Sequence, residues 1–263
     1  MHAVFLVAAT HLQHLQPYDR GHHKAALEHL SQVLPSFRNA IATISDSKEE
    51  SSGNALVACS MLLLQYSWVV DSEGWNNLLG LYRGLTSVVL KLFDTVERSR
   101  FSSMLKYSPR MRIECHLGGC TVPSDEAIFA HCLTCTKISN TQNVHLDDFI
   151  DLSRRLMTIL HALKLRRRDL ETFDLILDIA RYLFSLPNLL PDGFIGLLMI
   201  EDGRAQVMLL YYFAAVSRLP TERFWWMRER AVYMFEAIST NLGDTCMECT
   251  GRAREILDEG DSD

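Results

Sequence analysis

The residues of this sequence best suited to metal or redox chemistry are its seven cysteines. Four of them form two Cys-x-x-Cys pairs, Cys132 with Cys135 and Cys246 with Cys249, and His131 precedes the first pair. Such pairs are typical of zinc sites. The two pairs are about 110 residues apart, however, far more than in a zinc ribbon. Both pairs also fall in expected helices, where buried free cysteine is common, so we predict no metal site and no cofactor.

Three aspartates, Asp147, Asp148 and Asp151, have the Asp-Asp-x-x-Asp spacing with which all-helical prenyl-diphosphate enzymes hold Mg²⁺. The second Asn/Asp-rich motif that such enzymes need does not follow in the sequence. Acidic residues are also favoured in the first turn of any helix, because they complement the helix dipole. A Mg²⁺-dependent, terpene cyclase-like enzyme is therefore kept only as an alternative function, and no residue is predicted to be catalytic.

Histidines and basic residues form two further groups. Six of the ten histidines lie within the first 29 residues, without a nearby cysteine or a His-Glu-x-x-His motif, so we interpret them as a polar helix face. Arg166–Arg168 follow Lys164 and indicate a solvated helix end, with a nuclear targeting patch as the alternative. The sequence also lacks Gly-x-Ser-x-Gly, Walker and Gly-x-Gly-x-x-Gly motifs. The histidines concerned are His2, His11, His14, His22, His23 and His29.

The composition of the 263 residues is that of a soluble globular protein, with 48% hydrophobic and 22% charged residues. A net charge of −6 argues against a protein that binds nucleic acid by itself, because such binding neutralises phosphates. The odd number of cysteines does not fit a disulfide framework and favours the cytosol or nucleus. No run of 18 apolar residues occurs, and Met1–Ala9 lacks the basic flank of a signal peptide, so we expect neither a membrane span nor secretion.

Helical periodicity dominates the chain, and alternating strand patterns joined by tight turns are absent. We predict an all-α fold of roughly ten helices in one domain, residues 1–257, followed by an acidic tail, residues 258–263. Residues 45–53 are expected to form a polar loop, and residues 98–123 an irregular connection that is the only plausible internal boundary. The expected helices are 2–16, 18–43 with a bend or break at Pro35, 54–70, 75–93, 124–138, 146–165, 169–185, 194–200, 204–218, 221–242 and 244–257.

Large apolar side chains gather near the C-terminal end of the sequence. Binding sites for apolar ligands are lined by such groups, with a small number of polar contacts that fix the ligand's orientation. Tyrosine and tryptophan suit this role because each combines an apolar body with one polar tip. The residues alone leave two interpretations open, a hydrophobic ligand pocket or core packing. The candidate pocket residues are Met208, Tyr211, Tyr212, Phe224, Trp225, Trp226 and Met227.

Two groups of segments, one near each end of the chain, carry a family resemblance. They are Met1–Leu12, Ala25–Leu30, Asn54–Leu63, Trp75, Leu78-Leu79 and Gly84-Leu85 in the first group, and Arg204–Phe213, Phe224–Arg228 and Leu242-Gly243 in the second. In their order and spacing they resemble the fungal-specific regulatory domain that follows a binuclear zinc cluster in many fungal transcription factors. Within that family, the sterol uptake control branch is the most similar.

The resemblance implies an all-helical effector domain with an apolar pocket for ergosterol or a similar sterol. Sterol occupancy would then control nuclear entry and transcription by RNA polymerase II, with the transcription machinery, chaperones or a second copy of the chain as partners. The six-cysteine, DNA-reading module of the family is absent, so we expect no direct DNA binding by this chain alone. The chain is then a fragment, the product of a mis-predicted gene start, or a regulator without DNA contacts of its own. A helical scaffold without a ligand is the remaining alternative.

Overall fold

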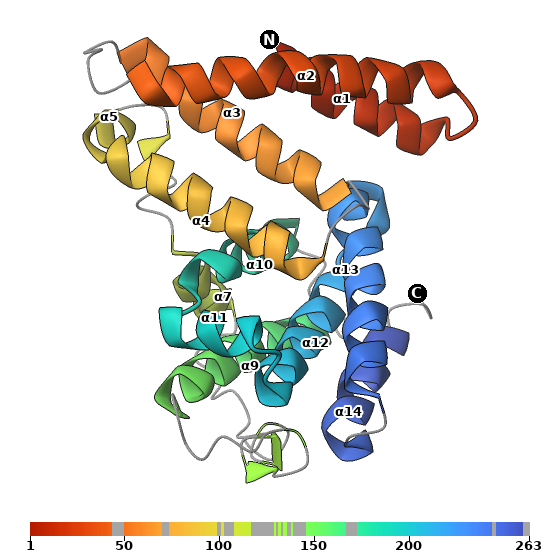
Figure 1. Cartoon of the computed structure of the whole chain (residues 1–263). Coiled ribbons are helices and arrows are strands. Elements are labelled where there is room, and N and C mark those ends of the chain that lie inside the picture. Colours follow the sequence, from red (N-terminus) through yellow and green to blue (C-terminus); the bar gives the residue numbers. More distant parts are fainter. Residues whose placement is uncertain are drawn as a thin grey trace. The chain divides into compact units, whose positions relative to one another are not determined.

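The structure is a computed structural model that describes residues 1–43, 50–69, 74–98, 101–102, 108–116, 129, 131–132, 134–135, 138, 146–166, 173–243 and 246–259. All regular structure in these residues is helical, which confirms the predicted all-α fold. The chain divides into two compact units, Met1–Tyr107 and Ser108–Asp263 (Figure 1). The division falls inside the segment 98–123 that the sequence marks as the only internal boundary.

The N-terminal unit begins with two helices that pack along each other, α1 (His2–Leu15) and α2 (Arg20–Thr43) (Figure 1). Asp19 precedes α2, and its carboxylate accepts a hydrogen bond of 2.8 Å from the backbone N–H of Gly21. Pro35 lies inside α2 without dividing it. The shared core is small, because it is built mainly from alanine, with Leu6 and Val33 as its larger members.

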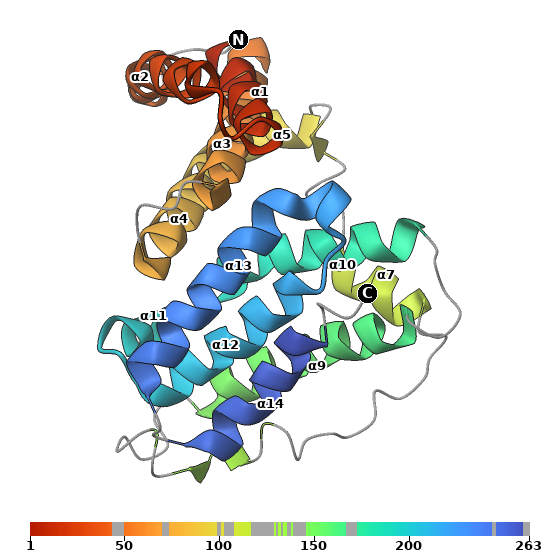
Figure 2. The ribbon, with the colours of Figure 1, turned by 90° about the vertical axis from the view of Figure 1, so that its right-hand side faces the viewer.

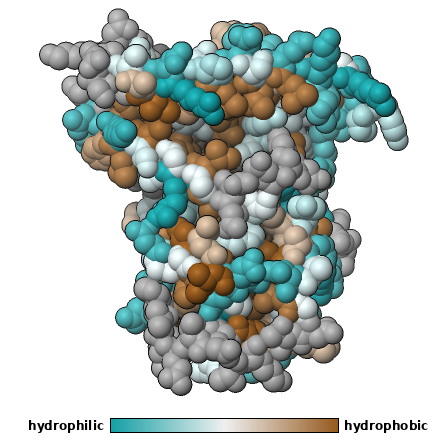
Figure 3. All heavy atoms as spheres, viewed as in Figure 1, coloured by the Kyte–Doolittle hydropathy of each residue, from teal (hydrophilic) through white to brown (hydrophobic). Residues whose placement is uncertain are grey.

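The described part of this unit also contains α3 (Glu50–Val69), α4 (Trp75–Lys91) and α5 (Phe93–Arg98). In the sequence, one predicted apolar stripe is formed by residues that recur at three- and four-residue steps, namely Trp75, Leu78, Leu79, Tyr82, Thr86, Val89 and Phe93. Leu78, Leu79 and Tyr82 are buried and so confirm this stripe. Its end was predicted wrongly: Phe93 is 44% exposed and Leu92 is buried instead, because α4 stops at Lys91 and the helical register restarts. α3 also begins inside the predicted polar loop of residues 45–53. Figure 3 shows apolar and polar surface side by side over α1 to α5.

The C-terminal unit surrounds one buried helix, α12 (Gly203–Ser217). Every residue of α12 from Arg204 to Ser217 is buried. Figure 2 shows α12 between α9, α13 and α14, all of which contact it. The other elements described in this unit are α7 (Pro109–His116), α9 (Leu146–Arg166), α10 (Phe173–Ser185), the 3₁₀ turn η2 (Leu186–Leu189), α11 (Asp192–Met199), α13 (Thr221–Leu242) and α14 (Met247–Asp258).

The structure corrects two predicted boundaries in the C-terminal unit. Residues 109–116 form α7 rather than irregular chain, because Pro109 occupies the first helical position, where its missing N–H is not needed. α14 begins at Met247 with Cys246 as its N-cap, three residues later than predicted. Most of the predicted helix 124–138, Arg167 and Arg168 of the basic run, and residues 260–263 of the acidic tail lie outside the described residues.

None of the described helices is by itself long and apolar enough to cross a membrane. One consecutive pair, Asp174–Leu189 with Asp192–Met199, reaches the required length and composition but is bent by 79° at its break.

Candidate functional site

The predicted pocket residues all lie on α12 and α13. Met208, Tyr211, Tyr212 and Met227 are at most 4% exposed, and Trp225 is 8% exposed. Phe224 and Trp226 are partly buried. Phe224 has non-helical backbone angles, φ −123° and ψ 28°, so α13 is kinked there before it continues along α12. The predicted burial of this set is therefore observed, but burial alone does not separate a pocket from a core.

The set divides between two sides of α12. The Tyr211 ring lies 4.6 Å from the Phe129 ring, measured between centroids. The Tyr212 hydroxyl instead donates a hydrogen bond of 3.1 Å to the backbone carbonyl of Leu183 on α10. Trp226 also faces α10, with its ring 5.5 Å from that of Phe184. Because successive residues of a helix point about 100° apart, adjacent tyrosines reach different neighbours. The structure thus does not bring all seven residues to one place.

Tyr211 has the most unusual environment of the seven. Its side chain is fully buried, and its hydroxyl has no hydrogen-bond partner among the described residues. Burial raises the pKa of the phenol, and the nearby Cys132 and Cys249 raise it further, so the hydroxyl is neutral at physiological pH. A buried donor without an acceptor costs about 1–3 kcal/mol, so an acceptor from a ligand would be favourable here.

Two glycines help to bring the Cys-x-x-Cys pairs together beside Tyr211. A Cβ atom on Gly203, the first residue of α12, would collide with the carbonyl oxygen of Ile138, so only glycine lets the segment that carries the first pair lie against α12. Gly243 ends α13 with φ +55°, a conformation that other residues rarely adopt. The chain then returns along α12 as α14, whose N-cap is Cys246.

His131 and three of the four paired cysteines form one compact cluster, with Cys132 beside it. The ligand atoms of His131, Cys135, Cys246 and Cys249 all lie within 4.8 Å of one another. The Cys135 Sγ is 3.6 Å from the Cys246 Sγ, and the Cys246 Sγ is 3.6 Å from the His131 Nε2. The three thiols are buried, whereas the His131 side chain is 39% exposed and its Nε2 lies 3.3 Å from the carboxylate of the exposed Glu248.

The thiols of this cluster differ in acidity. Burial acts to raise the pKa of Cys246, but hydrogen bonds with Cys249, His131 and Cys135 lower it to about 6. Burial raises the pKa of Cys132 to about 11 and also raises that of Cys249. Cys246 is therefore the most acidic of these three thiols. Clustered thiols beside an imidazole can bind a soft cation through their thiolate forms.

In the folded chain, the long spacing in sequence does not keep the two pairs apart. Cys135 and Cys246 are 111 positions apart in the sequence, and the described helices between them, α9 to α13, return the second pair to the first. A spacing rule derived from zinc ribbons describes short loops and does not describe a site assembled by tertiary packing. His131, which the sequence only noted as adjacent, belongs to the cluster.

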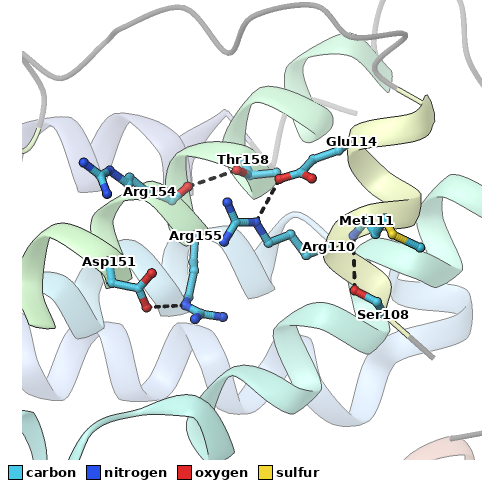
Figure 4. A network of polar contacts seen from close by, with 8 residues as sticks. All are labelled: Ser108, Arg110, Met111, Glu114, Asp151, Arg154, Arg155 and Thr158. Carbon is cyan, nitrogen blue, oxygen red and sulfur yellow. Dashed lines mark hydrogen bonds and ion pairs between the residues drawn. The ribbon is translucent and has the colours of Figure 1, made fainter. Parts of the chain in front are cut away.

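The three aspartates of the Asp-Asp-x-x-Asp motif lie at the start of α9, where Asp147 and Asp148 belong to the first turn. Asp147 is exposed, and the Asp151 carboxylate forms an ion pair of 2.7 Å with Arg155, one turn further along α9 (Figure 4). The other polar contacts in Figure 4 include the ion pair of Arg110 with Glu114 within α7. The positions of Asp147 and Asp148 are those that a helix N-terminus favours for acidic residues, as the sequence indicated, but Asp151 lies beyond the first turn, so its predicted place there is wrong.

Asp178 is a buried charged residue that the sequence analysis missed. Its side chain is 2% exposed, and its carboxylate lies 3.0 Å from Arg112 and 3.4 Å from His116, both on α7. Burial raises the pKa of this carboxyl, and Arg181 opposes the increase. Nothing in the sequence distinguishes Asp178 from exposed helical aspartates, since its partners lie more than 60 residues away. It links α7 to α10, and we assign it a structural role.

Three of the N-terminal histidines, His2, His11 and His23, are exposed, and the other three are partly buried, which agrees with a polar, partly exposed face on α1 and α2. The Nδ1 atoms of His2 and His29 are 3.2 Å apart, and His22 contacts Gln16 and Asp19.

The chain matches no family model, no curated protein and no solved structure. The functional assignment therefore depends on the site geometry and on the sequence resemblance described above.

Proposed function

We propose that the chain is the ligand-responsive regulatory domain of a fungal transcription regulator, which acts in the nucleus, has no catalytic activity and takes a sterol of the ergosterol type as its ligand. The family resemblance supports the class of protein. The observation that carries the ligand assignment is the Tyr211 hydroxyl, which is buried and has no partner among the described residues. A sterol offers a large apolar surface and one hydroxyl, which matches an apolar environment with one unsatisfied polar group.

The energetics favour such a ligand if the helices around Tyr211 separate to admit it. Transfer of apolar surface from water is worth about 25 cal/mol per Å², so a rigid lipid that buries a few hundred Å² gains several kcal/mol. The hydrogen bond between the ligand and Tyr211 adds a further gain, because it satisfies a group that is unsatisfied without the ligand.

Adjacent tyrosines allow a matched test of this proposal. Both Tyr211→Phe and Tyr212→Phe remove one buried hydroxyl from α12, but only the hydroxyl of Tyr212 has an acceptor, on Leu183. We expect solubilised ergosterol to raise the melting temperature of the wild-type protein, because it binds the folded form. Tyr211→Phe should retain the stability of the ligand-free protein and lose most of the ergosterol-induced increase. Tyr212→Phe should lower the ligand-free stability and retain the increase.

Three results would contradict the proposal. Saturating ergosterol that leaves the melting temperature unchanged would remove the sterol from it. An increase that is equal in wild type and Tyr211→Phe would remove Tyr211 as the polar contact. A fusion of the chain to an unrelated DNA-binding module that leaves a reporter insensitive to sterol depletion in yeast would remove the regulatory role and favour a ligand-free scaffold.

A further inference from the structure

We propose that His131, Cys135, Cys246 and Cys249 form a structural Zn²⁺ site that fastens the start of α14 to the segment before α9. This site goes beyond the proposed regulatory function and does not depend on it.

The cluster already has nearly the dimensions of a tetrahedral zinc site. Zn–S and Zn–N bonds of about 2.3 Å and 2.05 Å in tetrahedral geometry place two sulfurs about 3.8 Å apart and a sulfur and a nitrogen about 3.6 Å apart. The observed distances are 3.6 Å between the Sγ atoms of Cys135 and Cys246 and 3.6 Å between the Cys246 Sγ and the His131 Nε2. The largest separation among the four atoms, up to 4.8 Å, requires a closure of about 1 Å, which side-chain rotation can supply.

The donor set selects zinc and a structural role. Three sulfurs and one imidazole nitrogen form a common ligand set of structural Zn²⁺ sites. The protein supplies all four ligands, so no position is left open for water or substrate as in a catalytic site. Binding would release one proton to solvent from each ligand thiol that is still protonated, while the imidazole coordinates through its neutral Nε2. Glu248, which contacts that nitrogen, is exposed and can move away from it.

The backbone favours the ligand charges. Cys246 is the N-cap of α14, and Cys249 lies in its first turn. Unpaired N–H groups at a helix N-terminus stabilise negative charge and so stabilise thiolates there. Cys132 lies beside the cluster but outside the set whose ligand atoms meet within 4.8 Å, so we assign it as a buried neighbour rather than a ligand.

The principal experiment measures zinc in protein purified under reducing conditions. We expect close to one Zn²⁺ per chain by elemental mass spectrometry, with the complex intact by native mass spectrometry. Cys135→Ser, Cys246→Ser and His131→Gln should each lose most of this zinc. Cys132→Ala and Cys59→Ser should retain it, because the first removes a buried thiol beside the site and the second a thiol of the N-terminal unit.

A second measurement covers the case in which ligand variants fail to fold. Wild-type protein stripped of metal and titrated with Co²⁺ should bind one equivalent, with the visible bands of tetrahedral cobalt and a thiolate charge-transfer band. Three results would each overturn the proposal. They are zinc retained in Cys246→Ser, a Cys135–Cys246 disulfide in protein purified under reducing conditions, and cobalt spectra typical of octahedral geometry. Zinc lost in Cys132→Ala but retained in His131→Gln would overturn the ligand set. Sterol binding is not a readout here, so the two proposals fail independently.

Discussion

The two units of the chain satisfy their buried polar groups in different ways. In the described part of the N-terminal unit, the buried hydroxyls of Thr10 and Ser60 each donate 2.8 Å hydrogen bonds to a carbonyl one turn earlier in the same helix. In the C-terminal unit, buried polar groups also reach across the fold. Tyr212 bonds to Leu183, and Cys135 contacts Cys246.

This difference shows where chemistry can be placed in a helical protein. A hydroxyl that bonds to its own helix is satisfied wherever the helix packs, so it carries no information about neighbouring helices. A buried group whose partner lies on another element requires one arrangement of the two elements. Both candidate sites lie in the C-terminal unit. The described part of the N-terminal unit contains a counterexample, the Trp68 indole N–H, which donates a 2.9 Å hydrogen bond to the Tyr82 hydroxyl.

The largest effect should come from apolar truncation, and it should not distinguish the units. Phe194→Ala removes a fully buried ring that packs edge-on against Phe149 at 5.3 Å, and should cost about 3–5 kcal/mol. Leu6→Ala, at a site with 0% exposure, should cost about 2–5 kcal/mol in the N-terminal unit. Amide hydrogen exchange, analysed separately for peptides of each unit, measures the loss of stability in both variants. A near-neutral Leu6→Ala would mean that the N-terminal core is not packed as described.

Loss of a partner on another element should have the next largest effect. The Arg218 guanidinium donates to the carbonyl of Ile256 at 3.3 Å and to the Glu259 carboxylate at 2.9 Å, and so joins α12 to α14. Arg218→Met keeps most of the apolar volume and should cost about 1.5–3 kcal/mol by urea denaturation. Thr10→Val, which removes a hydroxyl bonded within its own helix, should cost less than about 1 kcal/mol. Equal losses of stability in Arg218→Met and Thr10→Val would contradict the proposed difference between hydrogen bonds across elements and hydrogen bonds within one helix.

The Trp68–Tyr82 pair sharpens the comparison inside the N-terminal unit. Tyr82→Phe removes the acceptor of a buried indole N–H and should cost about 1–3 kcal/mol, more than Thr10→Val in the same unit. Exchange of α3 and α4 amides is the measurement. Ser60→Ala on α3 is the matched control, because its hydroxyl bonds only one turn back, and a cost as large as that of Tyr82→Phe would contradict the expectation.

The smallest expected effect is the pH dependence of stability that comes from two carboxyl groups, whose pKa values are shifted in opposite directions by folding. A hydrogen bond from Arg254 lowers the pKa of Glu236, so its contribution to stability is present above the ordinary pKa of 4.5 and is lost as pH falls through the folded value. Because both side chains are substantially exposed, the contribution should stay below about 1 kcal/mol. Burial raises the pKa of the Asp178 carboxyl in the folded protein. The folded state is therefore favoured further as the pH falls through that raised pKa.

Stability measured between pH 3 and 7 separates the two carboxyl groups. Glu236→Gln should be destabilising at pH 7, with the difference from wild type shrinking toward pH 3. The difference between Asp178→Asn and wild type should change in the opposite direction over the same range. Parallel changes in the two variants would show that one of the two environments is not as described.

Periodicity and capping signals in the sequence predicted most of the helices, because these signals depend on residues three or four positions apart. The stripe at Leu78, Leu79 and Tyr82 is an example. Contacts between distant residues could not be predicted in this way. The spacing of Cys135 and Cys246 argued against a shared site, and no sequence signal singled out Asp178. Adjacent Tyr211 and Tyr212 were assigned to one pocket although they face different neighbours. The sterol, the nuclear location and the absence of catalysis stay predictions.

The position of α12 has a consequence for how the protein is made. This helix is buried along its whole length, yet two of the helices that cover it, α13 and α14, come later in the chain. About 40 residues follow Ser217 before α14 is complete, which takes about 2–8 s of translation at 5–20 residues per second. During that interval the apolar faces of a newly synthesised α12 lack their final cover. The ribosome-bound chain should therefore be a better substrate for chaperones while α13 and α14 are being synthesised than after the latter has docked.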